Sequence, residues 1–208
     1  ENTVPELTPF PALRFSSMAG DLSLLLAPPY DVIDPDAAAD LRARSRHNSV
    51  RLILPEGSGE ERYTAASETL RAWLDDGVLA PDPEPAAYVY RQEFETESGV
   101  SERFALFAAL RLAPFEEGEV LPHERTHAGP KEDRLALTLA TRTQLSPIFM
   151  VARDEEGRLY RLERSVLESA PDARAVTPDG IRHSLWVVAG GPSEELLASA
   201  AADPLLIA

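Results

Sequence analysis

The sequence predicts an α+β protein, built on a mixed, mainly antiparallel sheet with flanking helices. Segments 87–95 and 103–112 have the composition of two strands and lie on either side of a Glu-Ser-Gly turn at 97–99, which is typical of a β-hairpin. Between Glu60 and Asp76, apolar residues recur every three or four positions, the spacing of a helix with one buried face. Helices and strands mix without regular βαβ alternation, and this order favours the α+β class.

The first 80 residues are expected to form an N-terminal α/β subregion. Residues 10–15 predict a first strand, and two prolines exclude helix at the start of the stiff loop at 27–33. Asp34-Pro35 predicts the start of a helix, because Asp is a favoured N-cap and Pro a favoured first residue. The apolar run at 48–54 predicts a strand, which ends at a turn rich in Pro and Gly.

A proline-rich connection at 80–85 precedes the second subregion, residues 81–208, which is expected to combine the hairpin with helices. The apolar spacing at 158–169 fits a helix, although its first half also alternates as a strand does. Beyond the hairpin, the remaining patterns predict helices at 132–143 and 193–202, and strands at 147–153, 173–176, 183–188 and 205–208.

Composition limits the chemistry that the chain can perform. It contains no cysteine, which excludes disulfides, thiolate nucleophiles and cysteine metal sites. Its 35 acidic and 20 basic residues give a net charge of −15, which repels phosphates, so nucleic acid is not an expected partner. No apolar run approaches the roughly 20 residues that cross a bilayer. We expect a soluble cytoplasmic protein without membrane contact; the sequence does not indicate an oligomeric state.

The polar stretch 122–134 gathers two of the four histidines, the only lysine and three acids. Nineteen of the 20 basic residues are arginine, so the lysine at 131 indicates a position that needs a compact ammonium group. Gly129-Pro130 ends a loop, and the helix that follows opens with free backbone N–H groups, which attract anions. The stretch is therefore the strongest candidate site in the sequence.

We expect Lys131 and Arg134 to bind the phosphate or carboxylate of a small anionic ligand. His123, Glu124 or Asp133 would then move a proton as the catalytic acid or base. The alternative is a polar loop without function, in which the acids at the helix start only complement the helix dipole. The residue pattern alone leaves both interpretations open.

The same stretch contains the string His-Glu-Arg-Thr-His at 123–127, which is the H-E-x-x-H pattern of zinc proteases. In that interpretation His123 and His127 bind zinc, and Glu124 activates a water molecule. Pro122 before the string and Gly129-Pro130 after it leave too little room for the helix that the motif requires. We therefore expect no metal site here, and zinc hydrolysis is the less favoured alternative.

Three further residues are weaker candidates. Tyr30 and Asp31 follow two prolines on the stiff loop, which can present side chains to a ligand. Asp31 is an additional candidate general base, although an aspartate in a turn usually binds its own backbone. Arg51, on a predicted strand, either faces outward as a ligand-binding residue or pairs with an acid. His183 is expected to pack at the start of a strand.

Six blocks of the sequence, in this order, resemble an uncharacterised prokaryotic family known as domain of unknown function 1015. The resemblance covers residues 9–208 and depends on the whole set of blocks. The blocks are Ala-Pro-Pro-Tyr-Asp-Val-Ile at 27–33, His-Asn-Ser-Val-Arg at 47–51, Tyr-Val-Tyr-Arg-Gln at 88–92, His123-Glu124 with Thr126, Lys131 with Asp133-Arg134, and His-Ser-Leu-Trp at 183–186.

The resemblance implies a longer chain in which residues 205–208 continue into an Asp-Gly-His-His-Arg motif, so that this chain stops just before it. That motif relates the family to the ParB and sulfiredoxin superfamily, which includes nucleotide-dependent free serine kinases. The family pattern has His-Glu-x-Thr followed by Lys, Asp and Arg, which makes His127 incidental. DNA binding by analogy with ParB is disfavoured by the negative charge.

Together these observations predict part of an enzyme that handles a small phosphorylated or carboxylated metabolite. The specific hypothesis is a nucleotide-dependent phosphotransferase resembling the free serine kinases, with ATP or ADP and Mg²⁺ as cofactors. The rival hypothesis is a non-catalytic ligand-binding or regulatory module that recognises the metabolite without transforming it.

Overall fold

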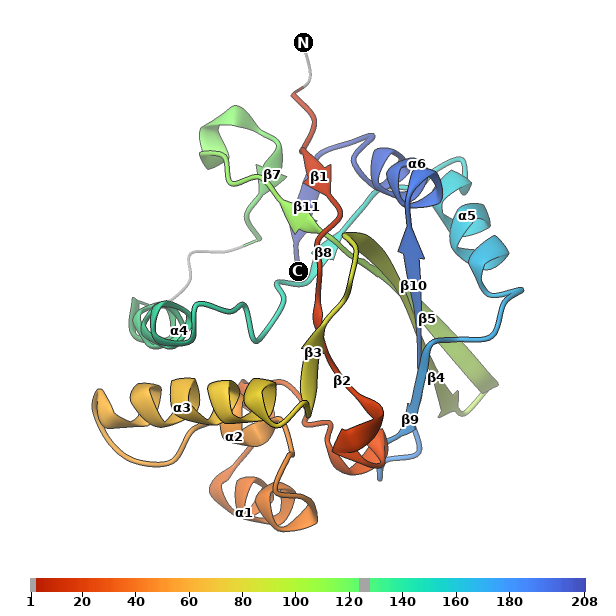
Figure 1. The fold of residues 1–208 in the computed structure, drawn as a ribbon. Coiled ribbons are helices and arrows are strands. Elements are labelled where there is room, and N and C mark those ends of the chain that lie inside the picture. The colour runs from red at the N-terminus through yellow and green to blue at the C-terminus, as the bar shows by residue number, and fades with distance from the viewer. Residues whose placement is uncertain (1–2, 124–127) are drawn as a thin grey trace. The chain divides into compact units, whose positions relative to one another are not determined.

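The computed structural model describes residues 3–123 and 128–208, and it has the α+β architecture that the sequence predicts (Figure 1). Across the described residues the chain forms six α-helices and four sheets, in which antiparallel pairing dominates. The chain divides into two units that interleave along the sequence. Unit 1 comprises residues 1–12, 81–125 and 148–208, and unit 2 comprises residues 13–80 and 126–147. The expected division into subregions 1–80 and 81–208 stays a prediction.

Unit 1 is built on a four-stranded antiparallel sheet with the strand order β5-β4-β10-β9. The expected hairpin forms its first half: Thr96 pairs with Gly99, whose positive φ of 115° suits a tight turn. The central pair joins distant segments, with Leu185 opposite Tyr90. The strands are β4 (Ala86–Thr96), β5 (Gly99–Phe107), β9 (Ala173–Val176) and β10 (Arg182–Ala189), and the predicted strands at 173–176 and 183–188 are confirmed.

Helices α5 (Arg158–Val166) and α6 (Gly191–Ala200) pack their apolar side chains against one face of this sheet. Trp186 and Val89 form the centre of this core. The ambiguous segment 158–169 is a helix because its leucines reach this core at helical spacing. Asp154 accepts hydrogen bonds from backbone N–H groups of the first turn of α5, which fixes the helix start.

Short strands complete unit 1. Strand β11 (Leu205–Ile207) lies parallel to β7 (Val120–Leu121) and antiparallel to β8 (Met150–Val151), which confirms the strand expected at 205–208. The strand expected at 147–153 is limited to β8, and it is not buried. Strand β1 (Leu7–Thr8) pairs with β6 (Ala109–Leu110).

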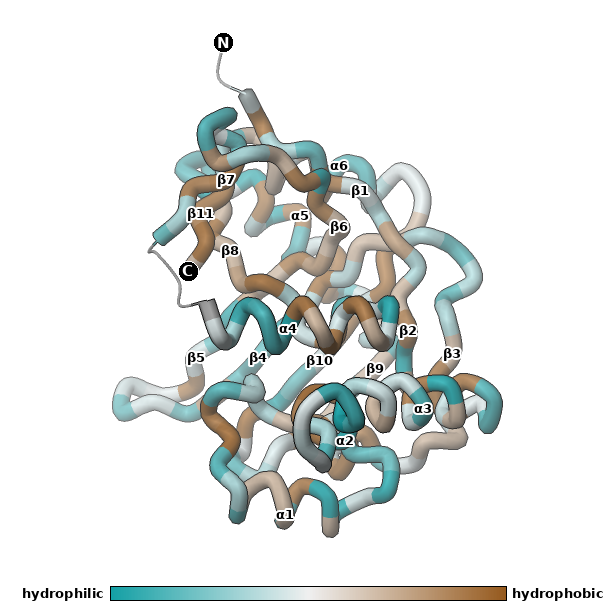
Figure 2. The backbone as a smooth tube through the Cα atoms, turned by 90° about the vertical axis from the view of Figure 1, so that its left-hand side faces the viewer, coloured by the Kyte–Doolittle hydropathy of each residue, from teal (hydrophilic) through white to brown (hydrophobic). Residues whose placement is uncertain are grey.

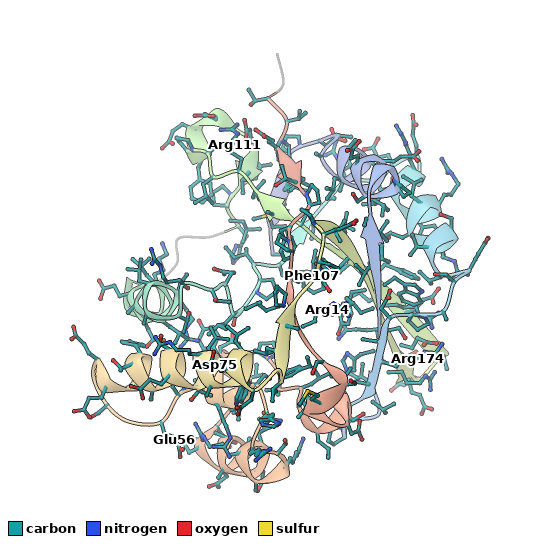
Figure 3. The ribbon with its side chains drawn as sticks, viewed as in Figure 1. Arg14, Glu56, Asp75, Phe107, Arg111 and Arg174 are labelled. Carbon is teal, nitrogen blue, oxygen red and sulfur yellow. The ribbon has the colours of Figure 1, made fainter. Side chains whose placement is uncertain are left out.

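Arg111, labelled in Figure 3, follows β6 and connects three segments of unit 1. Its Nε lies 3.0 Å from Glu6 Oε2, and its Nη2 donates to Glu119 Oε1 at 2.8 Å. Glu119 is buried, and its backbone carbonyl accepts a hydrogen bond from the N–H of Leu205. The arginine therefore supplies the countercharge that a buried carboxylate needs beside β11.

Unit 2 is mainly helical. Its main core surrounds Trp73 and Leu25, and a smaller cluster surrounds Val50. Helices α3 and α4 pack side by side. Hydrophilic and hydrophobic residues alternate along α4 (Figure 2). Among its leucines, Leu137 is buried, whereas Leu135 and Leu139 are exposed. The elements are β2 (Leu13–Phe15), α1 (Pro35–Arg44), α2 (Val50–Ile53), α3 (Glu61–Asp75), β3 (Leu79–Pro81) and α4 (Ala128–Thr141).

The local start and stop signals of unit 2 act as the sequence predicts. Asp34 caps α1, because its Oδ1 accepts the backbone N–H of Ala37 at 2.8 Å, and Pro35 is the first helical residue. The periodic segment between Glu60 and Asp76 is α3, and Gly77 follows it with a positive φ of 70°. No helix in the described residues is long and apolar enough to span a membrane.

The strand predicted at 48–54 is wrong, because these residues form a turn and the short helix α2. Asn48 is fully buried, and its Oδ1 accepts the N–H of Val50 at 3.0 Å, which starts a helical turn. Its amide nitrogen donates to the carbonyls of Leu24 and Leu26 at 2.8 and 3.2 Å. These contacts with a distant loop override the β preference of the Val, Leu and Ile residues.

Candidate functional site

Asp133, on α4, is the centre of an ion-pair cluster in unit 2. Its Oδ1 contacts the guanidinium of Arg62 and accepts the hydroxyl of Tyr63 at 2.8 Å, both from α3. Its Oδ2 accepts Arg134 Nε at 2.9 Å and also contacts Arg134 Nη2. Both carboxylate oxygens are therefore occupied by donors, and the aspartate joins α4 to α3.

Arg134 connects the same turn of α4 to two further segments. Its Nη1 donates to the carbonyl of Ile53, at the end of α2, at 2.7 Å. Its guanidinium lies over the ring of Tyr30, 4.2 Å from the ring centre, which is a close cation–π contact. Tyr30 opens a short 3-10 helix, Tyr30–Val32, in the stiff loop. Through these contacts Arg134 fixes the proline loop, α2 and α4 together.

The electrostatics of the cluster keep Asp133 ionised. Partial burial acts to raise the pKa of its carboxyl, but hydrogen bonds from Arg134 and Tyr63 and the charges of Arg134 and Arg62 outweigh it, so the pKa is lowered. A carboxylate with a lowered pKa and both oxygens occupied is a weak base. The predicted role of Asp133 in proton transfer is therefore not favoured by this geometry, which instead makes it an anchor for Arg134.

Replacing Asp133 by Asn is expected to lower the free energy of unfolding of unit 2 by about 2 kcal/mol, because charge-assisted hydrogen bonds are lost and two guanidiniums lose their counterion. Since folding lowers the pKa of this carboxyl, its stabilisation is present above the unfolded value of 3.8 and is lost as the pH falls below it. Urea unfolding at pH 7 and pH 3 measures both effects. Glu132→Gln, the exposed neighbour, is the control; an equal loss in both variants would contradict the assignment.

Lys131 lies one helical turn before Arg134 on α4, and it is exposed. Within the described part of the chain its ammonium has no hydrogen-bond or ion-pair partner. The residue is thus a free cation on a turn of helix that its neighbours hold in place. This combination is suited to an anionic ligand, because the protein contributes a charge without first breaking an internal contact.

The other predicted residues have different positions. Asp31 is exposed beside Tyr30, on the loop that Arg134 contacts. Arg51 lies on α2 and not on a strand; its Nη2 donates to the carbonyl of Arg42, near the end of α1, at 2.9 Å. Arg51 therefore satisfies a helix terminus. This contact is neither of the two alternatives that the sequence offered, and ligand binding by Arg51 stays a prediction.

His123 is exposed and belongs to unit 1, whereas Lys131 and the cluster belong to unit 2. Glu124 and His127 lie outside the described residues, together with the rest of 124–127. The acid–base role of His123 and Glu124, and the alternative zinc interpretation of the string, therefore stay predictions.

Sequence reasoning missed Arg62 and Tyr63. In the sequence, Tyr63 stands at the helical spacing of the other apolar residues of 60–76, and Arg62 has no distinguishing feature among the 19 arginines. The signal that could have found them is the adjacency of a guanidinium and a phenol in the first turn of α3, both of which can donate to one carboxylate. Arg62 also lies over the Tyr63 ring, 4.7 Å from its centre.

Unit 1 has its own polar cluster around His183, which packs at the start of β10 as expected. His183 Nδ1 lies 2.6 Å from the hydroxyl of Tyr90, and its Nε2 lies 2.9 Å from Thr177 Oγ1. Burial lowers the pKa of His183 despite the charge of Asp179, and burial raises the pKa of Tyr90. Both shifts favour neutral groups, so this cluster fixes the β9–β10 turn and does not present a charge.

Fold and site together define an α+β protein with a free ammonium group beside a rigid cluster of arginine, aspartate and tyrosine side chains. Its place among proteins follows from a family comparison. The chain belongs to the family described as protein of unknown function (DUF1015), whose sequence model matches residues 7–208. The chain matches no curated protein and no solved structure. The relation to the ParB and sulfiredoxin superfamily stays a prediction.

Proposed function

We propose that this chain belongs to an enzyme that handles a small phosphorylated or carboxylated metabolite, and that Lys131 binds the anionic group. The observation that carries the proposal is the contrast between Lys131 and its neighbours: Arg62 and Arg134 are held by internal partners, whereas the only lysine is exposed and unpaired within the described residues. A chain with a net charge of −15 repels anions overall, so a binding site needs such a local cation.

Arg134 has a positioning role in this proposal. Its donors are directed to Asp133 and to the carbonyl of Ile53, and its face covers Tyr30. It therefore holds the turn that carries Lys131 and places the Tyr30–Asp31 loop beside the same helix. Preorganisation of this kind lowers the entropic cost of binding a ligand. The first backbone N–H groups of α4 add a favourable dipole for an anion near Lys131.

Nucleotide-dependent phosphotransfer is the specific reaction that we propose to test. It needs Mg²⁺ to neutralise nucleotide phosphates and a base to accept a proton from the attacking hydroxyl. Asp133 offers no free oxygen for either task, because both of its oxygens are occupied. Asp31 is exposed on the loop that Arg134 holds, so it is the carboxylate of unit 2 that we assign to proton transfer.

The test is a comparison of Lys131→Gln with Arg71→Gln, an exposed residue of α3 whose replacement removes the same charge. Titration calorimetry with ATP–Mg²⁺, ADP, phosphoserine and inorganic phosphate should show binding that the Lys131 variant weakens about tenfold, the effect of a lost contact of roughly 1.4 kcal/mol. Arg71→Gln should bind as the wild type does. Equal binding by all three proteins would refute the role of Lys131.

A turnover assay, together with these titrations, distinguishes the enzyme hypothesis from the hypothesis of a non-catalytic regulatory module. Incubation of the whole protein that contains this chain with ATP–Mg²⁺ and serine, followed by measurement of ADP and phosphoserine, should show turnover that Asp31→Asn abolishes while ligand binding is retained. Tight binding of a phosphorylated metabolite without any turnover would instead assign the non-catalytic module. Binding of neither class of ligand would overturn both.

A further inference from the structure

A groove in unit 1 is lined mainly by arginine side chains. It lies where α5 packs over the sheet and has a volume of about 440 Å³. Three of the residues that line it are arginines, one from β4 and two from α5, in a chain of net charge −15. Its lining residues are Arg91, Arg161, Arg164, Ser165, Leu167 and Glu168.

Arg91 forms the inner wall of the groove. It lies on β4, its side chain is 24 % exposed, and its guanidinium lies 5.7 Å from the ring centre of Trp186, over the core of unit 1. Its Nη2 donates to Glu93 at 2.8 Å, whereas its Nε is buried and has no hydrogen-bond partner among the described residues. Packing against Trp186 and the contact with Glu93 fix this guanidinium before any ligand binds.

Arg161 and Arg164 form the outer wall. They are three residues apart on α5 and so share one face of the helix. Arg161 Nη1 donates to the carbonyl of Glu156 at 2.7 Å. This acceptor is a neutral backbone oxygen, so the contact does not neutralise the charge of the guanidinium. Arg164 is half-exposed, and its Nη1 donates to Glu102 at 2.8 Å.

Glu102, which does not line the groove, is an internal anion that two of the lining arginines already contact. Its carboxylate lies 2.8 Å from Arg164 and 3.8 Å from Arg91, so one internal anion already contacts two of the three guanidiniums. Glu102 projects from β5, and about a third of its side chain is exposed. A ligand with a higher charge can therefore replace it while Glu102 turns to solvent.

We propose that this groove is a binding site for a phosphate group, either free or as the monoester of a small molecule. A phosphate has three terminal oxygens and up to two negative charges, which match three separate guanidiniums better than a carboxylate with two oxygens does. Glu93 and Glu168 remain nearby and limit the net positive charge, so the site favours a compact dianion that contacts several guanidiniums at once. The inference concerns unit 1 and is independent of Lys131.

The experiment uses the whole chain and titrates inorganic phosphate and phosphoserine, with acetate as the carboxylate control, at constant ionic strength. Calorimetry gives the affinity, and the Nε–H signals of arginine in ¹H–¹⁵N spectra locate the contact. We expect Arg161→Gln and Arg164→Gln each to weaken phosphate binding about tenfold. Glu102→Gln should tighten it, because the internal competitor loses its charge.

Arg153→Gln is the matched control, since Arg153 is an exposed arginine of unit 1 outside the groove lining. Weakening by this control equal to that by the groove variants would overturn the site, as would the absence of saturable phosphate binding. Acetate binding as tight as phosphate binding would overturn the assignment to phosphate. Lys131→Gln should leave the groove signals unchanged, so that failure of this inference and failure of the proposed function are distinguishable.

Discussion

Replacing Asn48 by Ala should lower the free energy of unfolding of unit 2 by about 4 kcal/mol, because one buried and two partly buried hydrogen bonds are lost and two carbonyls lose this donor. The fully buried amide donates to the carbonyls of Leu24 and Leu26 and accepts the N–H of Val50. It joins the loop before α1 to the start of α2. Trp73, buried in the core of unit 2, provides a fluorescence signal for the measurement.

Two variants sharpen this prediction. Asn48→Asp keeps the acceptor for Val50 but places a charge against the two carbonyls, so it should destabilise at least as much as alanine above pH 5. Gln144→Ala removes an amide that makes an exposed hydrogen bond to the carbonyl of Ser146, and it should change stability by less than about 0.5 kcal/mol. A small loss in Asn48→Ala, comparable to that of Gln144→Ala, would show that the amide contacts do not hold α2.

Replacing Glu163 by Gln should stabilise unit 1 at pH 8. Glu163 is a buried residue of α5, and burial, with a smaller contribution from the charge of Asp154, raises the pKa of its carboxyl from 4.5 to about 7. Ionisation in the folded state therefore costs up to about 3 kcal/mol above pH 7, at 1.36 kcal/mol for each pKa unit. Since the folded state binds the proton more tightly, wild-type stability should fall as the pH rises from 4.5 to 7.

The pH dependence is the decisive measurement for Glu163. Urea unfolding followed through Trp186, which lies in the same core, should show the variant more stable than the wild type at pH 8 and nearly equal to it at pH 4.5. Glu155→Gln, at an exposed position, controls for the change in net charge. A stability difference that does not vary with pH would mean that Glu163 is not protonated preferentially in the folded state.

The elements that the sequence predicted well are those whose signals are local. The hairpin of β4 and β5 depends on strand-forming residues around a local turn, and helix α3 depends on helical spacing within its own segment. Helix α2 could not be predicted in this way, because Asn48 is held by carbonyls more than twenty residues earlier. Its apolar residues have the preference of a strand, and only the tertiary contact makes them helical.

In the candidate site, too, the residues with a local signal could be predicted, and the tertiary contacts could not. Lys131, Asp133 and Arg134 were recognisable because they stand together in one polar stretch, and Lys131 is the only lysine. That Asp133 would be held by Arg62, some seventy positions earlier, is a consequence of the packing of α3 on α4, and the adjacency of Arg62 and Tyr63 does not by itself identify the partner. Without those partners the sequence suggested a ligand contact for Arg134, where the structure shows an internal one.

The interleaving of the two units has a consequence for how this chain can be made and divided. Unit 1 needs β10 beside β4, which are about ninety residues apart in the sequence, and unit 2 needs α4 beside α3 across the whole hairpin. On the ribosome, α3 is therefore complete long before its partner helix α4 emerges. Strand β4 of the hairpin cannot pair with β10 until the last quarter of the chain has been synthesised. No single truncation yields either unit intact, so shortened versions are expected to expose cores and to require the remainder of the chain in trans.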